Sequence, residues 1–64
     1  MQGSMVRAIR ERLGLSVEEL AFILRISENL LTVWEAGIRE VPQVYAQRLI
    51  RFDRHGLGMF AVRG

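Results

Sequence analysis

The sequence predicts an all-α fold: a compact domain of four short helices followed by a short apolar C-terminal tail. The main observation is that apolar residues recur at spacings of three and four within separate segments, which is the helical period. The second is that capping residues or glycines stand at the segment boundaries. Within residues 14–37, two such segments are separated by only about three residues, which is typical of a helix-turn-helix motif.

The first helix is predicted over residues 5–13. Its apolar positions follow the helical period, and Gly14 comes next, where a left-handed C-cap fits. These positions are Met5, Val6, Ile9 and Leu13. Residues 1–4 precede a second methionine and look like an expression leader, so we expect the domain to span residues 5–56.

The second and third helices are predicted from their caps. Ser16 stands three residues before Glu19, a capping box that starts a helix running through Leu24. Ser27 can cap a third helix over residues 28–36, which Gly37 ends. The residues of the second helix expected to be buried are Val17, Leu20, Ala21 and Leu24. On the third helix, Leu31, Trp34 and the following Ile38 are expected to point inward, and Asn29, Thr32, Val33 and Ala36 outward.

A fourth helix is predicted from Pro42 to His55. Proline is favoured at a first helical position, and the preceding Val41 must be extended. The expected apolar stripe consists of Val44, Tyr45, Leu49 and Phe52. Gly56 and Gly58 end this helix and leave residues 57–64 as an apolar tail.

Composition excludes several function classes. The chain has 64 residues, so it is one domain at most, and such a chain buries only about 60% of its unfolded surface. It has no cysteine and one histidine, so we expect no metal and no cofactor. No nucleophile is paired with a base, which argues against an enzyme. No signal peptide or long apolar run is present, so we expect a cytoplasmic protein with no membrane partner.

The run from Ile9 to Pro42 resembles the lambda-repressor/Cro family, also called the Xre type. The resemblance rests on LGLSVEELA at residues 13–21, the Ile-Ser step at 26–27 and WEAGIREVP at 34–42. It implies a sequence-specific regulator of double-stranded DNA, such as a phage Cro-like protein, a repressor or the DNA-binding part of an antitoxin. It also implies an ion pair between Arg10 and Glu35.

The resemblance also implies which residues meet DNA. The third helix would enter the major groove, with base-facing positions at Glu28, Asn29, Thr32 and Val33. The backbone-facing positions would be Ser16, Val17, Arg25 and Arg39. Asparagine suits an adenine edge, glutamate a cytosine amine, and the threonine and valine methyl groups pack on thymine methyl groups.

Several positions depart from the family pattern. Many relatives carry Gln at the position of Val17, Gly at that of Arg25 and a polar residue at that of Leu30. Relatives often carry Arg or Lys at the positions of Glu28, Val33 and Ala36, but none of these three residues is basic here. All nine basic residues are arginines, at a net charge of only +2. DNA reading would therefore depend on Asn29, Glu28 and methyl contacts, with arginines outside the third helix supplying the charge.

Two alternatives stay open at this point. The domain could dock a protein partner through Leu30, Val33 and the tail, rather than bind DNA. The tail itself could either pack over the gap between the first and fourth helices or join a second copy. Two half-sites are usually needed for specificity, which favours a homodimer. The candidate dimer residues are Leu57, Met59, Phe60 and Val62.

Overall fold

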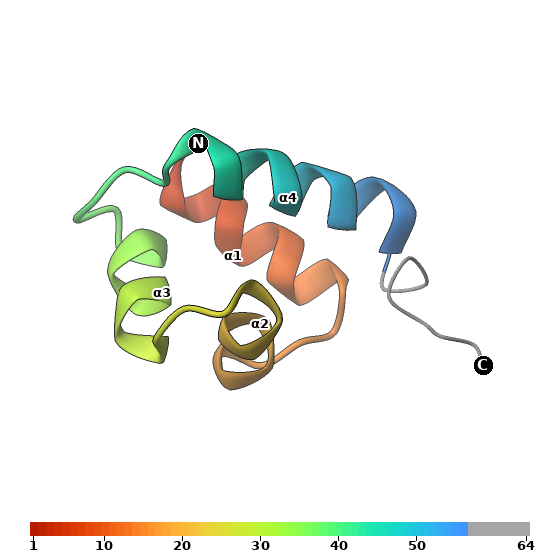
Figure 1. Ribbon diagram of the computed structural model, residues 1–64, viewed down its shortest axis with the longest axis horizontal. Coiled ribbons are helices and arrows are strands. Elements are labelled where there is room, and N and C mark those ends of the chain that lie inside the picture. The colour runs from red at the N-terminus through yellow and green to blue at the C-terminus, as the bar shows by residue number, and fades with distance from the viewer. Residues whose placement is uncertain (57–64) are drawn as a thin grey trace.

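The computed structural model describes residues 1–56, which form four helices and no strand. The helices are α1 (Gly3–Arg12), α2 (Val17–Leu24), α3 (Glu28–Glu35) and α4 (Gln43–His55) (Figure 1). The predicted all-α fold is confirmed. The tail, with the dimer candidates Leu57, Met59, Phe60 and Val62, lies outside the described residues.

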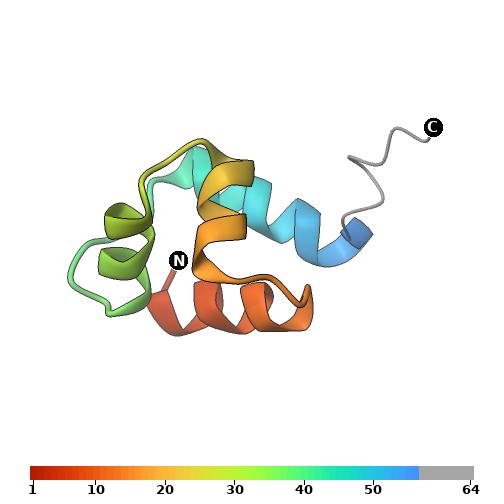
Figure 2. The same ribbon diagram turned by 90° about the horizontal axis from the view of Figure 1, so that it is seen from below.

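Helix α1 lies at the centre of the arrangement. It packs against α3 and against α4, while α2 packs against α3. Both views place α3 at one end of the molecule and the last turn of α4 at the other (Figures 1 and 2). Helix α3 is therefore presented at one end, where it packs against α1 and α2.

A small apolar core holds the four helices together. Its largest member is Trp34 of α3, which is 2% exposed. The core residues are all apolar, and their burial stabilises the fold by about 25 cal/mol per Å². The core consists of Val6, Ile9, Leu20, Ala21, Leu24, Leu31, Trp34, Val41, Leu49 and Phe52.

The helix ends follow the predicted local chemistry. Ser16 Oγ accepts a hydrogen bond from the Glu19 backbone N–H at 3.0 Å, and Glu19 Oε1 accepts from the Ser16 N–H at 2.8 Å, which completes the capping box. Ser27 Oγ likewise accepts from the Leu30 N–H at 3.0 Å at the start of α3. Gly37 follows α3 with φ at 77°, a left-handed conformation that glycine adopts without steric cost.

Three predicted core positions are wrong. Ile38 is 73% exposed, because it lies in the bend beyond Gly37, where the helical period no longer applies. Val44 is 53% exposed. The inward face of α4 carries Leu49, Phe52 and the half-buried Tyr45, and Val44 is turned about 100° from Tyr45 around the helix axis. Met5 is 52% exposed, because it lies to one side of the helix face on which Val6 and Ile9 are buried.

The predicted start of the first helix at Met5 is two residues late. Helix α1 begins at Gly3, which is buried, and Met1 packs against the core. A Cβ atom on Gly3 would collide with the backbone carbonyl oxygens of Trp34 and Glu35. The first turn of α1 therefore abuts the last turn of α3, a close approach that only glycine permits.

An ion pair that the sequence did not indicate joins α1 to α4. The Arg12 guanidinium donates to both carboxylate oxygens of Asp53, at 3.0 and 2.7 Å. This hydrogen bonding lowers the pKa of Asp53 and raises that of Arg12. Since both side chains are reached by solvent, the pair fixes orientation more than it adds stability.

One residue departs from ordinary backbone geometry. Arg25, the C-cap of α2, has φ at 60° and ψ at 45°, and it is the one non-glycine with positive φ in the described part of the chain. The left-handed conformation lets the Ile26 N–H reach the Ala21 carbonyl at 3.0 Å, which closes the helix end. A side chain in this conformation costs roughly 1–2 kcal/mol relative to glycine.

We expect Arg25→Gly to raise the free energy of unfolding by about 1 kcal/mol, because glycine removes this steric cost. Chemical denaturation monitored by circular dichroism measures the change. Arg39→Gly is the matched control, since Arg39 is an exposed arginine without positive φ and should show no gain. Equal or lower stability of Arg25→Gly would contradict the assignment of strain.

Candidate nucleic-acid interface

The outward face of α3 carries three of the four residues predicted to meet bases. Glu28, Asn29 and Thr32 are all exposed, opposite the buried Leu31 and Trp34. Side chains three and four positions apart are neighbours on a helix surface, so Thr32 lies beside both Asn29 and Glu28, and the three side chains form one continuous polar face. This face can offer both hydrogen-bond donors and acceptors to a partner.

Val33, the fourth predicted base-facing residue, is placed differently. It is half-buried, as is Leu30 three residues before it. Residues three apart are neighbours on a helix surface, so these two form an apolar flank beside the polar face. Val33 therefore offers its methyl groups only at the edge of the face.

The C-terminal half of α3 is held against α4 by aromatic contacts. The rings of Trp34 and Tyr45 are 5.3 Å apart between centroids and tilted by 52°, within the range of favourable aromatic pairs. The Arg48 guanidinium lies over the Tyr45 ring, 5.6 Å from its centroid. The Trp34–Tyr45 contact thus links the end of α3 to the start of α4.

Glu35, the last residue of α3, is held by an arginine of α1. Its side chain is 4% exposed, and both carboxylate oxygens accept from Arg10: Nε to Oε2 at 2.7 Å and Nη2 to Oε1 at 3.0 Å. Arg10 Nη1 also donates to the Leu15 carbonyl at 3.0 Å. Hydrogen bonding to Glu35 raises the pKa of Arg10, so the cation is present at every ordinary pH. The ion pair implied by the family resemblance is present.

The start of α2 offers free backbone donors. The Ser16 N–H is already bonded to Glu19, but the N–H groups of Val17 and Glu18 lie in the first turn, where no carbonyl of the helix can accept them. The Ser16 hydroxyl is exposed and keeps its own proton for donation. The Val17 side chain is half-buried against the core, so only its backbone can meet a ligand.

Two exposed arginines stand at the edges of this region. Arg25 follows α2, and Arg39 lies in the connection after α3, next to Glu40. Neither forms an ion pair within residues 1–56, so both cations are free to meet an anion. Helix α3 itself carries no basic residue, and Glu28 occupies its first turn. Positive charge therefore borders the polar face rather than lying on it.

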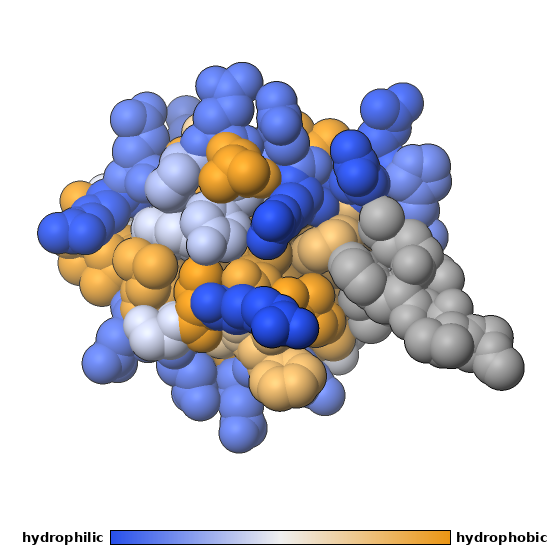
Figure 3. Space-filling view, in the orientation of Figure 1, coloured by the Kyte–Doolittle hydropathy of each residue, from blue (hydrophilic) through white to orange (hydrophobic). Residues whose placement is uncertain are grey.

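One exposed residue near this region was not anticipated. Phe22 of α2 is 83% exposed, the highest value among the large apolar side chains described. Its position one residue after Ala21, off the line of Leu20, Ala21 and Leu24, would have shown that it points outward. The space-filling view also shows apolar surface across the middle of one face, below the polar side chains along α4 (Figure 3).

Other kinds of site find no support in the described chain. Residues 1–56 contain no group of three or more side chains that could hold a metal ion. The helices in this part of the chain are also too short or too polar to cross a membrane.

Comparison with known proteins gives one match. A family model described as helix-turn-helix matches residues 6–53, three quarters of the chain, from the first turn of α1 to the last turns of α4. No curated protein and no solved structure matches.

We expect Glu35→Gln to lower the free energy of unfolding by about 3 kcal/mol, because it leaves the largely buried Arg10 guanidinium without its counter-charge. Thermal and chemical denaturation measure the loss. Glu28→Gln is the control, since that carboxylate is exposed and makes no ion pair within residues 1–56. Similar stability of the two variants would show that the buried pair does not organise the fold.

Proposed function

Since this chain belongs to the helix-turn-helix family of the Xre and lambda-repressor type, we propose that it is a sequence-specific DNA-binding transcription regulator. The observation that carries the proposal is the exposed polar face of α3, which Trp34 and the Arg10–Glu35 pair hold in a fixed orientation. A rigid helix with a polar outward face is what the major groove admits.

Base readout would come from four side chains. The Asn29 amide can bond an adenine edge through two hydrogen bonds, and Glu28 can accept from a cytosine amine. The Thr32 methyl group can pack on a thymine methyl group, with Val33 adding apolar contact at the edge of the face. The Asn29 amide is neutral and the Glu28 carboxylate is acidic. Discrimination between bases would therefore rest on hydrogen bonds to the matching base edge rather than on attraction to the charge of DNA.

Phosphate contacts would surround these base contacts. The free N–H groups of Val17 and Glu18, with the Ser16 hydroxyl, suit one phosphate at the start of α2. Arg25 and Arg39 would each neutralise another. With two cations and the acidic Glu28 in the same interface, the non-specific component of binding should be small and strongly reduced by salt.

We further propose that two copies act together on adjacent half-sites. A single module of this size covers about 600–1,000 Å² of DNA contact, which is too little for high specificity alone. Two copies about one helical turn apart would read a palindromic site. A regulator of this kind works in the cytoplasm, needs no cofactor and has no catalytic role.

One observation favours a second candidate function. The half-buried Leu30 and Val33 form an apolar flank on α3, which could dock a protein partner rather than DNA. In that case Val33→Asp would abolish partner binding, and Asn29 would be dispensable. The polar face consists of three exposed side chains, whereas Leu30 and Val33 are half-buried, so we place DNA binding first.

The first test is readout by Asn29. A random duplex library is bound at low salt, the enriched sequence is determined, and affinities are measured by fluorescence anisotropy. We expect Asn29→Ala to cost about 1–3 kcal/mol on the enriched duplex and little on an unrelated one, because only the adenine contact is lost. Absence of any enriched duplex would exclude sequence-specific DNA binding.

The second test concerns Arg39. We expect Arg39→Ala to weaken binding to both duplexes by a similar factor and to reduce the slope of log affinity against log salt by about one, since one phosphate contact is lost. Arg54→Ala is the matched control, because Arg54 lies in the last turn of α4, at the opposite end of the molecule from α3 (Figure 1). An unchanged slope in Arg39→Ala would remove that residue from the interface.

A further inference from the structure

One carboxylate meets two arginines at the end of α3. Glu35 accepts two hydrogen bonds from Arg10, at 2.7 and 3.0 Å. Arg7 Nε also lies near Glu35 Oε1, at the longer distance of 3.5 Å. Arg7 and Arg10 are three residues apart, so they are neighbours on one side of α1. The cluster of these three side chains therefore combines two positive charges with one negative charge.

The surplus positive charge is carried by Arg7. The side chain of Arg10 is 15% exposed, and its guanidinium bonds both Glu35 and the Leu15 carbonyl. The side chain of Arg7 is 58% exposed, and its two Nη groups make no hydrogen bond within residues 1–56. Each Nη group carries two N–H donors. Arg7 is therefore a cation that is held at Nε and open to a ligand at both Nη groups.

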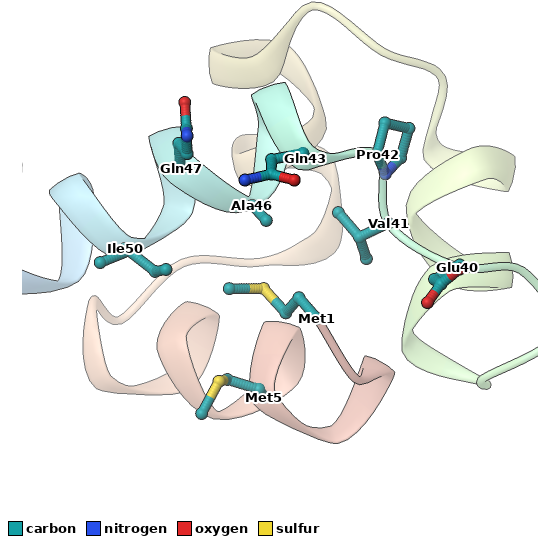
Figure 4. A pocket seen from close by; sticks show the side chains of 9 residues that line it. All are labelled: Met1, Met5, Glu40, Val41, Pro42, Gln43, Ala46, Gln47 and Ile50. Carbon is teal, nitrogen blue, oxygen red and sulfur yellow. The ribbon is translucent and has the colours of Figure 1, made fainter.

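Arg7 lies on the side of α1 that faces α3. Met5 borders a hollow of about 610 Å³ between α1 and the start of α4 (Figure 4). Arg7 comes two residues after Met5, which is about 200° around the helix axis. Gly3, one turn before Arg7, abuts the carbonyl groups of Trp34 and Glu35. Arg7 is thus turned away from the hollow and toward the last turn of α3.

This position borders the outward face of α3. Glu35 follows Glu28 by seven residues, about two turns, so the two side chains lie nearly on one line along the helix. Glu28 is exposed, whereas the side chain of Glu35, beside the arginines of α1, is 4% exposed. The exposed Thr32 is three residues before Glu35 and so is its neighbour on the helix surface. Arg7 therefore lies where α1 meets the polar face.

We propose that Arg7 binds a phosphate of the DNA backbone at this edge of the α3 face, a contact that rests on the DNA-binding function proposed above. Glu35 holds Nε of Arg7, and the two Nη groups donate to the phosphate oxygens. A guanidinium suits this task because its N–H groups form a planar fork that matches two oxygens of one phosphate.

A phosphate completes the charges of the cluster. Two arginines three residues apart on a helix repel each other, and the single carboxylate of Glu35 neutralises one of them. An exposed ion pair as long as that of Arg7 adds little to stability. The negative charge of a phosphate balances the second arginine. Because Glu35 belongs to α3, the same contact ties the position of α3 to the DNA backbone.

The salt dependence of DNA binding tests the role of Arg7. Affinities of Arg7→Gln for the enriched duplex and for an unrelated duplex are measured by fluorescence anisotropy over a range of salt concentrations. We expect both affinities to fall by roughly tenfold at low salt, because a charged hydrogen-bonded contact is lost. The slope of log affinity against log salt should decrease by about one. Arg7→Lys should keep that slope, since it keeps the charge.

Arg12→Gln is the matched control. Arg12 also belongs to α1, its side chain is 57% exposed, and it is paired with a carboxylate, but that carboxylate is Asp53 of α4. This variant removes the same charge away from α3, so its salt slope should equal that of the unchanged protein. Equal decreases in the two variants would show that the slope follows net charge and would overturn the contact.

The remaining outcomes separate this contact from the proposed function. If the unchanged protein enriches no duplex, the proposed function fails and the Arg7 contact fails with it. If it binds an enriched duplex and Arg7→Gln keeps the full salt slope, only the Arg7 contact is overturned. Thermal unfolding of Arg7→Gln gives a second measurement, and we expect a midpoint close to that of the unchanged protein. A lower midpoint with an unchanged slope would make Arg7 a purely structural residue.

Discussion

The contact between Arg10 and Glu35 determines how α3 is held. One guanidinium binds the last residue of α3 through two hydrogen bonds and the connection before α2 through a third, to the Leu15 carbonyl. Three segments of the chain are thus fixed by one side chain of α1. Because the Glu35 carboxylate is almost fully buried, the pair is little screened by solvent, and its geometry is correspondingly rigid. The direction of α3 and the position of the free N–H groups of α2 both follow from this contact.

The same contact shapes the chemistry of the outward face. Glu35 is directed inward, so its charge is neutralised inside the domain, and the exposed face of α3 is left with Glu28, Asn29 and Thr32. A face without cations gains little from general attraction to phosphates. In the function we propose, its value for binding would lie in hydrogen bonds that require a particular base, and such bonds are useful only if the helix is held rigidly. The buried pair and the Trp34–Tyr45 contact supply that rigidity.

Much of the fold was predictable because its signals are local. The capping box at Ser16, the cap at Ser27 and the glycine after α3 act within a few residues, so the sequence shows them directly. The features that the sequence did not indicate depend on distant parts of the chain. The collision that requires glycine at position 3 involves the carbonyls of α3, and the Arg12–Asp53 pair joins residues 41 positions apart. The outward face of α3 was predictable from its period, but the partial burial of Val33 depends on how the helix packs in the assembled domain.

The strained backbone at Arg25 bears on the interface as well as on stability. Glycine would adopt the left-handed conformation at this helix end without cost, yet the chain has an arginine there, at a cost of roughly 1–2 kcal/mol. In a small domain that is a considerable fraction of the total stability. The side chain is exposed and forms no ion pair within residues 1–56, so nothing in this part of the chain offsets the cost. A cation held between α2 and α3, beside a face that has none, is explained if it meets an anion that the isolated domain lacks, and a DNA phosphate is such an anion.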